Sequence, residues 1–202
     1  MKLQPSISRR RGRPLSFDRD AALRTAMLTF WRHGYEATSL RDLTTALGVT
    51  PPSIYAAFGD KKAFFHEAVA LYLGTPNRSS AIIADAATAR DAAECLLEAS
   101  VVGFTGAETP PGCLLASATI SCSSSAADVQ DELAAIRRGI EKSLARKIRA
   151  GIKAGELDAD ADSEALAAHV MAVIQGMSTL ARDGARREKL RRVAAQAMLA
   201  WP

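Results

Sequence analysis

One short stretch of this 202-residue chain gathers side chains that donate hydrogen bonds or carry positive charge. Thr50, Ser53 and Tyr55 lie close together, and Lys61 and Lys62 follow after a glycine and an aspartate. Hydroxyl and ammonium groups of this kind donate hydrogen bonds to phosphate oxygens and to the edges of nucleic-acid bases. The stretch could therefore bind an anionic polymer, provided that the fold presents these side chains on one surface.

Two short helices joined by a tight turn are expected to hold these residues. Ser39-Leu40-Arg41-Asp42 has the pattern of a capping box and predicts a helix that Gly48 ends. Thr50 followed by Pro51-Pro52 predicts the start of a second helix, which ends near Phe58. Such a pair forms a helix-turn-helix, whose second helix enters the major groove of DNA. The alternative is a helical hairpin that only packs against its neighbours.

The second of these helices is expected to have one buried face and one exposed face. Ile54 and Phe58 have the spacing of a buried helical face. The opposite face would carry Thr50, Ser53, Tyr55 and Ala56. Because Ala56-Ala57 offers only apolar contact, base reading is expected to depend on few residues near the start of the helix.

Longer helices flank this pair. Apolar spacing and the caps Asp18 and Asp60 predict helices over residues 18–33 and 61–73. Gly, Pro, Asn and Ser in residues 74–80 predict a break. The expected organisation is a flexible basic arm at 1–16, a helix-turn-helix DNA-binding domain at 17–73 and a helical domain at 74–202.

Residues 17–69 resemble the DNA-binding domain of the TetR family of bacterial transcriptional regulators, of the TetR/AcrR type. The similarity includes the turns Gly34-Tyr35 and Gly48-Val49-Thr50, the pair Ile54-Tyr55 in the third helix, and Lys61 after it. The resemblance implies that the following residues contact DNA: Ser39, Arg41, Thr50, Pro52, Ser53, Tyr55 and Lys61.

The resemblance also implies the fold class. We expect an all-α protein with an N-terminal three-helix DNA-binding domain and a C-terminal helical domain for ligand binding and dimerisation, with about nine helices in total. In the second domain, apolar patterns predict helices over 89–105, 113–121, 128–154, 162–182 and 187–201.

The N-terminal arm offers a second contact with DNA. Residues 1–62 carry 11 Lys or Arg against 5 Asp or Glu, whereas the remaining residues carry 15 against 17. Arg11-Gly12-Arg13-Pro14 resembles the core of an AT-hook, which would place Arg11 and Arg13 in a narrow A·T minor groove. The alternative is a basic tail that contacts only phosphates.

The second domain contains a helix that is apolar on nearly every side, Ala165–Ala181. Such a helix is expected to be buried against more than one neighbour. Together with the last helix it predicts a two-fold interface of four helices in a homodimer, and a core helix of a monomer is the alternative. The interface would use Ala168, Ala172, Gly176, Leu190, Val193, Ala197 and Trp201.

A ligand pocket in the second domain is expected to combine apolar surface with a few polar groups. For each candidate, membership of the ordinary core is the alternative. The candidate residues are Phe104, Cys113, Leu114, Ser117, Ile120, Ile140, Leu144, Met171, Gln175 and Ser178.

Cys113 carries a separate hypothesis. It follows Pro110-Pro111-Gly112 and is expected to start a helix, where a thiol becomes more reactive. Cys113 could therefore sense an electrophile or an oxidant. The alternative is a buried, inert cysteine.

Other classes of function lack the residues that they need. The three cysteines and three histidines have no zinc-ligand spacing, and no glycine-rich phosphate loop or nucleophile elbow is present. We therefore expect no metal, no cofactor and no enzyme activity. No apolar run approaches the roughly 20 residues of a membrane span, so we expect a cytoplasmic protein with no membrane contact.

The resemblance implies a DNA-binding transcriptional regulator. We expect a repressor that a small-molecule effector releases from double-stranded, palindromic operator DNA, and a homodimer would match the symmetry of a palindrome. The alternatives are a thiol-based sensor that uses Cys113 and a DNA-binding protein with no ligand.

Overall fold

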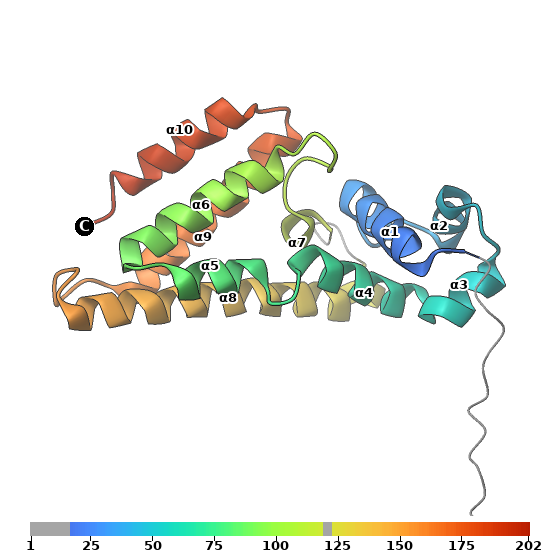
Figure 1. The fold of residues 1–202 in the computed structure, drawn as a ribbon, viewed down its shortest axis with the longest axis horizontal. Coiled ribbons are helices and arrows are strands. Elements are labelled where there is room, and N and C mark those ends of the chain that lie inside the picture. Colours follow the sequence, from blue (N-terminus) through green and yellow to red (C-terminus); the bar gives the residue numbers. More distant parts are fainter. Residues whose placement is uncertain (1–16, 119–122) are drawn as a thin grey trace, which may run out of the picture.

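The computed structural model describes residues 17–118 and 123–202. Within these residues the secondary structure is entirely helical, with ten α-helices and one short 3-10 helix. Figure 1 shows a head formed by α1 to α4 and a body formed by α5 to α10, with the long helix α8 running beneath both. The arrangement confirms the predicted all-α fold. The arm at 1–16, with Arg11 and Arg13, lies outside the described residues.

The four helices of the head agree closely with the predicted ranges. Asp18 caps the first helix through hydrogen bonds from the backbone N–H groups of Asp20 and Ala21. Gly34 ends that helix at a φ of 89°. The helices are α1 (Arg19–His33), α2 (Leu40–Leu47), α3 (Pro51–Phe58) and α4 (Lys61–Leu73).

Aromatic rings form the core of the head. The Phe58 and Phe64 rings stack with centroids 3.9 Å apart, and Phe30 meets Phe65 edge to face at 5.0 Å. All four side chains are buried. Burial of aromatic rings contributes strongly to stability, so α1, α3 and α4 are held as one unit.

The body is built around α6 and α9, with α8 beneath them and α10 on the opposite side (Figure 1). None of the helices in the described part of the chain is long and apolar enough to cross a membrane. The body helices are α5 (Arg78–Asp85), α6 (Ala89–Phe104), α7 (Leu114–Ser117), α8 (Ala127–Ala154), α9 (Ser163–Arg182) and α10 (Arg187–Met198), and Ser124–Ala126 form the 3-10 helix.

Helix α5 was not predicted from the sequence, which indicates a break at 74–80 and the next helix from residue 89. It begins at Arg78, inside the expected break, because the Asn77 side chain caps it by accepting a hydrogen bond from the Ser80 N–H at 3.2 Å. Only Ile83 of this short helix is buried. One buried residue produces no periodic apolar pattern, so the sequence did not reveal the helix.

Two backbone carbonyls of the body receive hydrogen bonds from the head. The Trp31 indole N–H donates to the Gly112 carbonyl at 3.2 Å in a buried position. The backbone N–H of Tyr35 donates to the Ala118 carbonyl at 2.9 Å. The end of α1 is therefore attached to the segment that surrounds α7.

An ion-pair cluster forms a second attachment between the head and the body. The Lys62 ammonium lies 2.6 Å from the Asp128 carboxylate and 3.1 Å from Glu132 on α8. His66 lies 2.6 Å from Glu132. The Lys62 ammonium is therefore paired with carboxylates that are distant in the sequence, and a phosphate contact from Lys62 stays a prediction.

Gly112 occupies a position that a side chain cannot share. Its φ is +82°, a conformation that favours glycine. A Cβ there would lie 2.8 Å from the Ser178 carbonyl oxygen of α9. The residue whose carbonyl accepts the Trp31 hydrogen bond therefore lies directly against α9.

Two glycine substitutions should have opposite effects on stability. We expect Gly112→Ala to lower the free energy of unfolding by about 1–3 kcal/mol, because the methyl group collides with α9. Gly139→Ala is the control, since a Cβ on this exposed α8 residue meets nothing within 4 Å. The control should be neutral or should stabilise by about 0.5–1 kcal/mol. Thermal unfolding by circular dichroism, at one protein concentration, measures both, and equal behaviour would contradict the prediction.

Candidate nucleic-acid interface and ligand cavity

The start of α2 is held by the predicted capping box. The Ser39 hydroxyl oxygen accepts from the Asp42 backbone N–H at 3.1 Å. The Asp42 carboxylate accepts from the Ser39 backbone N–H at 2.7 Å and from its hydroxyl at 2.6 Å. These hydrogen bonds from Ser39 lower the pKa of the Asp42 carboxyl from its ordinary value.

The turn between α2 and α3 places two hydroxyl groups together. Gly48 ends α2 in the left-handed conformation, with a φ of 64°. Thr50 precedes α3, but its side chain does not cap the helix. Its hydroxyl instead lies 3.0 Å from the Ser53 hydroxyl. Ile54 and Phe58 are buried, whereas the Thr50–Ser53 pair lies at the N-terminal end of α3, where Thr50 is exposed.

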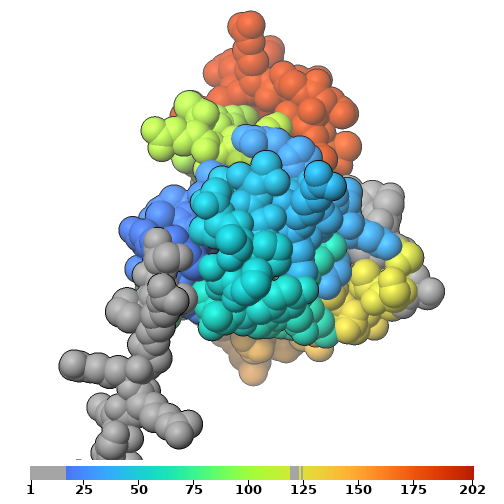
Figure 2. All heavy atoms as spheres, turned by 90° about the vertical axis from the view of Figure 1, so that its right-hand side faces the viewer, coloured from blue at the N-terminus to red at the C-terminus, as the bar shows by residue number. Residues whose placement is uncertain are grey.

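The helix-turn-helix lies at the end of the head that is farthest from α10 (Figure 1), and Figure 2 shows α2 and α3 on the surface facing the viewer. The Tyr55 side chain is 53% exposed, a high value for a large aromatic residue. Arg41 is exposed, and its side chain makes no hydrogen bond or ion pair with any described residue. The other exposed candidates are Ser39, Thr50 and Pro52, and Ser53 is half-buried.

Lys61 is more constrained than its sequence position indicates. Its ammonium lies 4.4 Å from the centre of the Tyr35 ring and 3.4 Å from the Glu36 carbonyl oxygen. The side chain is half-buried at the start of α4. A phosphate contact from Lys61 therefore remains a prediction.

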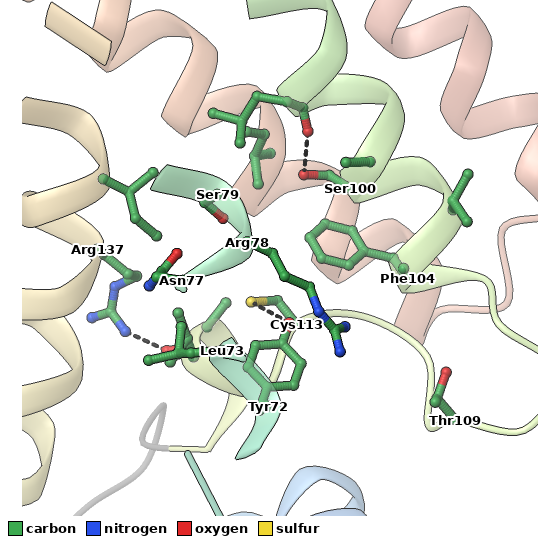
Figure 3. Close-up of a pocket in the computed structure, with 18 of the residues that line it drawn as sticks. Tyr72, Leu73, Asn77, Arg78, Ser79, Ser100, Phe104, Thr109, Cys113 and Arg137 are labelled. Atoms are coloured by element: carbon green, nitrogen blue, oxygen red, sulfur yellow. Dashed lines mark hydrogen bonds between the residues drawn. The ribbon is translucent and has the colours of Figure 1, made fainter. Parts of the chain in front are cut away.

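A cavity of about 530 Å³ lies between the head and the body. Figure 3 shows Tyr72 of α4, Phe104 of α6, Cys113 and Arg137 of α8 around it. Of the pocket residues predicted from the sequence, those that line the cavity are Phe104, Cys113, Ile140, Met171 and Gln175.

Four predicted pocket residues lie near the cavity without lining it. Leu114 and Leu144 are fully buried in the body core. The Ser178 hydroxyl accepts a hydrogen bond from the Cys113 N–H at 2.8 Å, and the Ser117 hydroxyl donates to the Cys113 carbonyl at 2.8 Å. Both serines therefore position the backbone of Cys113. The remaining candidate, Ile120, lies outside the described residues.

Sequence reasoning missed the contribution of the head and of Arg137 to the cavity. Trp31 and Tyr72, whose rings meet edge to face at 4.9 Å, line it from α1 and α4. Large aromatic side chains are common in any core, so no local pattern marks these two as cavity residues. The signal for Arg137 was present, because this residue falls on the apolar stripe of α8.

A hydroxyl and a thiol meet at the wall of the cavity. The Tyr72 hydroxyl donates a hydrogen bond to the Cys113 sulfur at 3.4 Å (Figure 3). Burial raises the pKa of Tyr72 well above its ordinary value, so the phenol remains protonated. The Thr109 hydroxyl, which also lines the cavity, is buried and has no hydrogen-bond partner among the described residues.

The predicted dimer residues divide into two groups. Ala168, Ala172 and Gly176 are exposed on α9, and their four-residue spacing places them on one helical face. Val193 and Ala197 of α10 are half-buried and line a shallow groove beside α9. In contrast, Leu190 and Trp201 are buried within their own chain, so neither presents its side chain to a partner.

An exposed helix-turn-helix joined to a helical body that shares a cavity with it defines a DNA-binding transcriptional regulator. The family comparison agrees: residues 22–68 match the bacterial regulatory proteins of the tetR family. Residues 89–198 match the tetracyclin repressor-like C-terminal domain. The chain therefore belongs to the TetR family, as the sequence resemblance predicts.

Similar proteins cover nearly the whole chain. The HTH-type transcriptional repressor ComR of Escherichia coli K12 is 34% identical over 198 residues, which cover 97% of this chain and 94% of ComR. A cysteine mutant of the TetR family regulator CifR, solved with 26-bp operator DNA, is 42% identical with a TM-score of 0.88. That match covers 94% of this chain and 100% of the CifR chain. A putative TetR regulator from Rhodococcus sp. RHA1 is 36% identical with a TM-score of 0.63. That match covers 90% of this chain and 98% of the Rhodococcus chain.

The capping box should make stability depend on pH through Asp42. The lowered pKa means that the carboxylate stabilises the fold above the unfolded value of about 3.9, and that this stabilisation disappears as the pH falls through the lower folded value. We expect Asp42→Asn, which mimics the protonated acid, to lower the melting temperature at pH 7. The difference from the parent should shrink below about pH 4.

Asp160→Asn is the matched control, because Asp160 is exposed and makes no hydrogen bond or ion pair with any described residue. Melting curves of the parent and of both variants from pH 7 to pH 3 measure the effect. A difference for Asp42→Asn that stays constant over this range would contradict the role of the carboxylate.

Proposed function

We propose that this protein is a repressor that binds palindromic operator DNA as a homodimer and that a small molecule in the cavity releases it. The observation that carries the proposal is that both the head and the body line the cavity, through Trp31 and Tyr72 on one side and through α6, α8 and α9 on the other. A ligand there contacts the head directly. A ligand that binds more tightly to the head–body arrangement unsuited to DNA shifts the population away from DNA binding.

The proposed contacts with DNA come from the exposed end of the head and from the arm. Similarity to a repressor by name and to a regulator solved with operator DNA supports this interface. Such a regulator acts in the cytoplasm, where bacterial DNA lies. The contacting residues are Ser39, Arg41, Thr50, Pro52, Ser53, Tyr55 and Lys61 in the head, and Arg11 and Arg13 in the arm.

The proposed dimer uses the exposed face of α9. Alanine and glycine at 168, 172 and 176 allow a second helix to approach closely, and Val193 and Ala197 widen the apolar surface. Leu190 and Trp201 support α10 from within the chain. A two-fold axis at this surface pairs two heads, as a palindrome requires.

Operator binding tests the DNA interface. Fluorescence anisotropy with the DNA upstream of the protein's own gene should show that Arg41→Ala and Tyr55→Phe each weaken binding about tenfold, because each loses one hydrogen bond to phosphate. Arg41→Ala should also reduce the slope of log affinity against log salt by about one.

Lys142→Ala is the control, because Lys142 is exposed on α8 in the body. It should bind DNA as the parent does. Parental affinity in both head variants would contradict the proposed interface. Compounds that raise the melting temperature are then added to the protein–DNA complex, and failure of every one to release DNA would contradict control of DNA binding by a ligand.

A thiol sensor is a second candidate, and the position of Cys113 favours it. The Cys113 sulfur lines the cavity, so a small electrophile in the cavity would meet it. The thiol would add across an activated C=C bond: the S–C bond forms as the C=C π bond breaks, and the adjacent carbon takes up a proton in place of the one that the thiol loses. The bulky adduct would then occupy the cavity in place of a reversible ligand.

N-ethylmaleimide tests the thiol hypothesis. If Cys113 is the sensor, treatment should release DNA from the parent and from the Cys95→Ser/Cys122→Ser double variant, but not from Cys113→Ser. Cys95 is exposed on α6 and serves as the control thiol. Release from Cys113→Ser that equals release from the parent would reject the hypothesis.

A further inference from the structure

An arginine occupies a core position of α8. The buried residues of this helix recur every three or four positions, as in Val129, Leu133, Ile140 and Leu144. Arg137 lies four residues after Leu133 and three before Ile140, so it falls on the same face. A well-packed core helix carries an apolar residue at such a position, because a partly buried cation loses hydration.

The Arg137 guanidinium is only partly satisfied. It donates a hydrogen bond to the Leu115 carbonyl and makes no ion pair with any described residue. No Asp or Glu occurs in 1–16 or 119–122, so no acidic side chain lies outside the description. Burial lowers the pKa of Arg137, but a guanidinium stays charged at neutral pH. Four of its five N–H donors remain available.

The cavity beside Arg137 is positive and largely apolar. Arg24, Arg78 and Arg137 line it, and no Asp or Glu does. Figure 3 shows Arg137 and Arg78 beside the same space. A volume of about 530 Å³ is within the usual range for pockets that bind small organic molecules. The apolar lining includes Trp31, Leu71, Ile82, Leu96, Phe104 and Met171.

We propose that the cavity binds an amphipathic organic carboxylate, whose carboxylate group pairs with Arg137 and whose apolar part fills the rest of the space. A carboxylate matches the fork of guanidinium donors with two parallel hydrogen bonds. A neutral ligand of the same shape would leave the cation partly buried and unpaired. This assignment rests on the proposed function, because it names the class of the ligand that releases DNA.

Pairs of acids and amides test the class of ligand without any substitution. The probes are octanoate, decanoate and 3-phenylpropanoate, each compared with its amide, and decyl phosphate. Isothermal titration with the full-length protein should show that at least one acid binds tenfold or more tightly than its amide. The proposal is overturned if no acid binds more tightly than its amide, or if decyl phosphate binds more than tenfold more tightly than decanoate.

Substitution of Arg137 tests the position of the carboxylate. Arg137→Gln should weaken binding of the best acid tenfold or more and leave its amide unaffected, and Arg137→Lys should lose less because it keeps the charge. Arg138→Gln is the matched control, since Arg138 is the exposed neighbour that does not line the cavity. Unchanged acid affinity in Arg137→Gln, with a parental circular dichroism spectrum, would overturn the proposal.

The two proposals fail in different ways. An acid that binds through Arg137 but does not release operator DNA supports the ligand class and contradicts ligand-controlled repression. A neutral compound that releases DNA, with no preference for acids, supports the proposed function and overturns the ligand class.

Discussion

The attachment of α1 to Gly112, in the segment between α6 and α7, is the constraint on which the arrangement of head and body depends. The Trp31 indole donates to the Gly112 carbonyl in a buried position, where loss of a partner leaves a polar group unsatisfied. Gly112 in turn lies against Ser178 of α9 so closely that no side chain fits. The indole ring also forms part of the cavity wall. Trp31 therefore belongs to the head, bonds to the body and lines the cavity. A ligand that fills the cavity would contact the head through this residue.

The other attachment has a different physical character. The side chains of Lys62, Asp128, Glu132 and His66 are partly exposed, and ion pairs in contact with water contribute little net stability. Such pairs orient two elements but exchange readily with water. The phenylalanine rings of α1, α3 and α4 pack on one another and hold the helix-turn-helix to the rest of the head.

Local chemistry explains which parts of the structure the sequence predicts. The capping box at Ser39, the prolines that open α3 and the cap at Asp60 each involve residues that are close in the sequence. The helix-turn-helix can therefore be predicted from the local sequence. The cavity depends on contacts between distant segments, such as the one between Trp31 and Gly112, and no local pattern records them. Helix α5 lacks an apolar period and was missed for that reason. The sequence pattern places Arg137 on the apolar face of α8, but only the structure shows that this side chain lines a cavity.

Helix α8 connects the cavity to the head through its own side chains. Arg137 stands on the face of α8 that meets the cavity, and Glu132 and Asp128 lie one to three turns earlier along the helix, where they pair with Lys62 of α4. A carboxylate that draws Arg137 away from the Leu115 carbonyl would disturb the contact between α8 and α7. Helix α7 is joined to α1 through the Ala118 carbonyl, which accepts from Tyr35. Both sets of contacts link the neighbourhood of the partly buried cation to the head, so a ligand that neutralises this charge would act beside the junction.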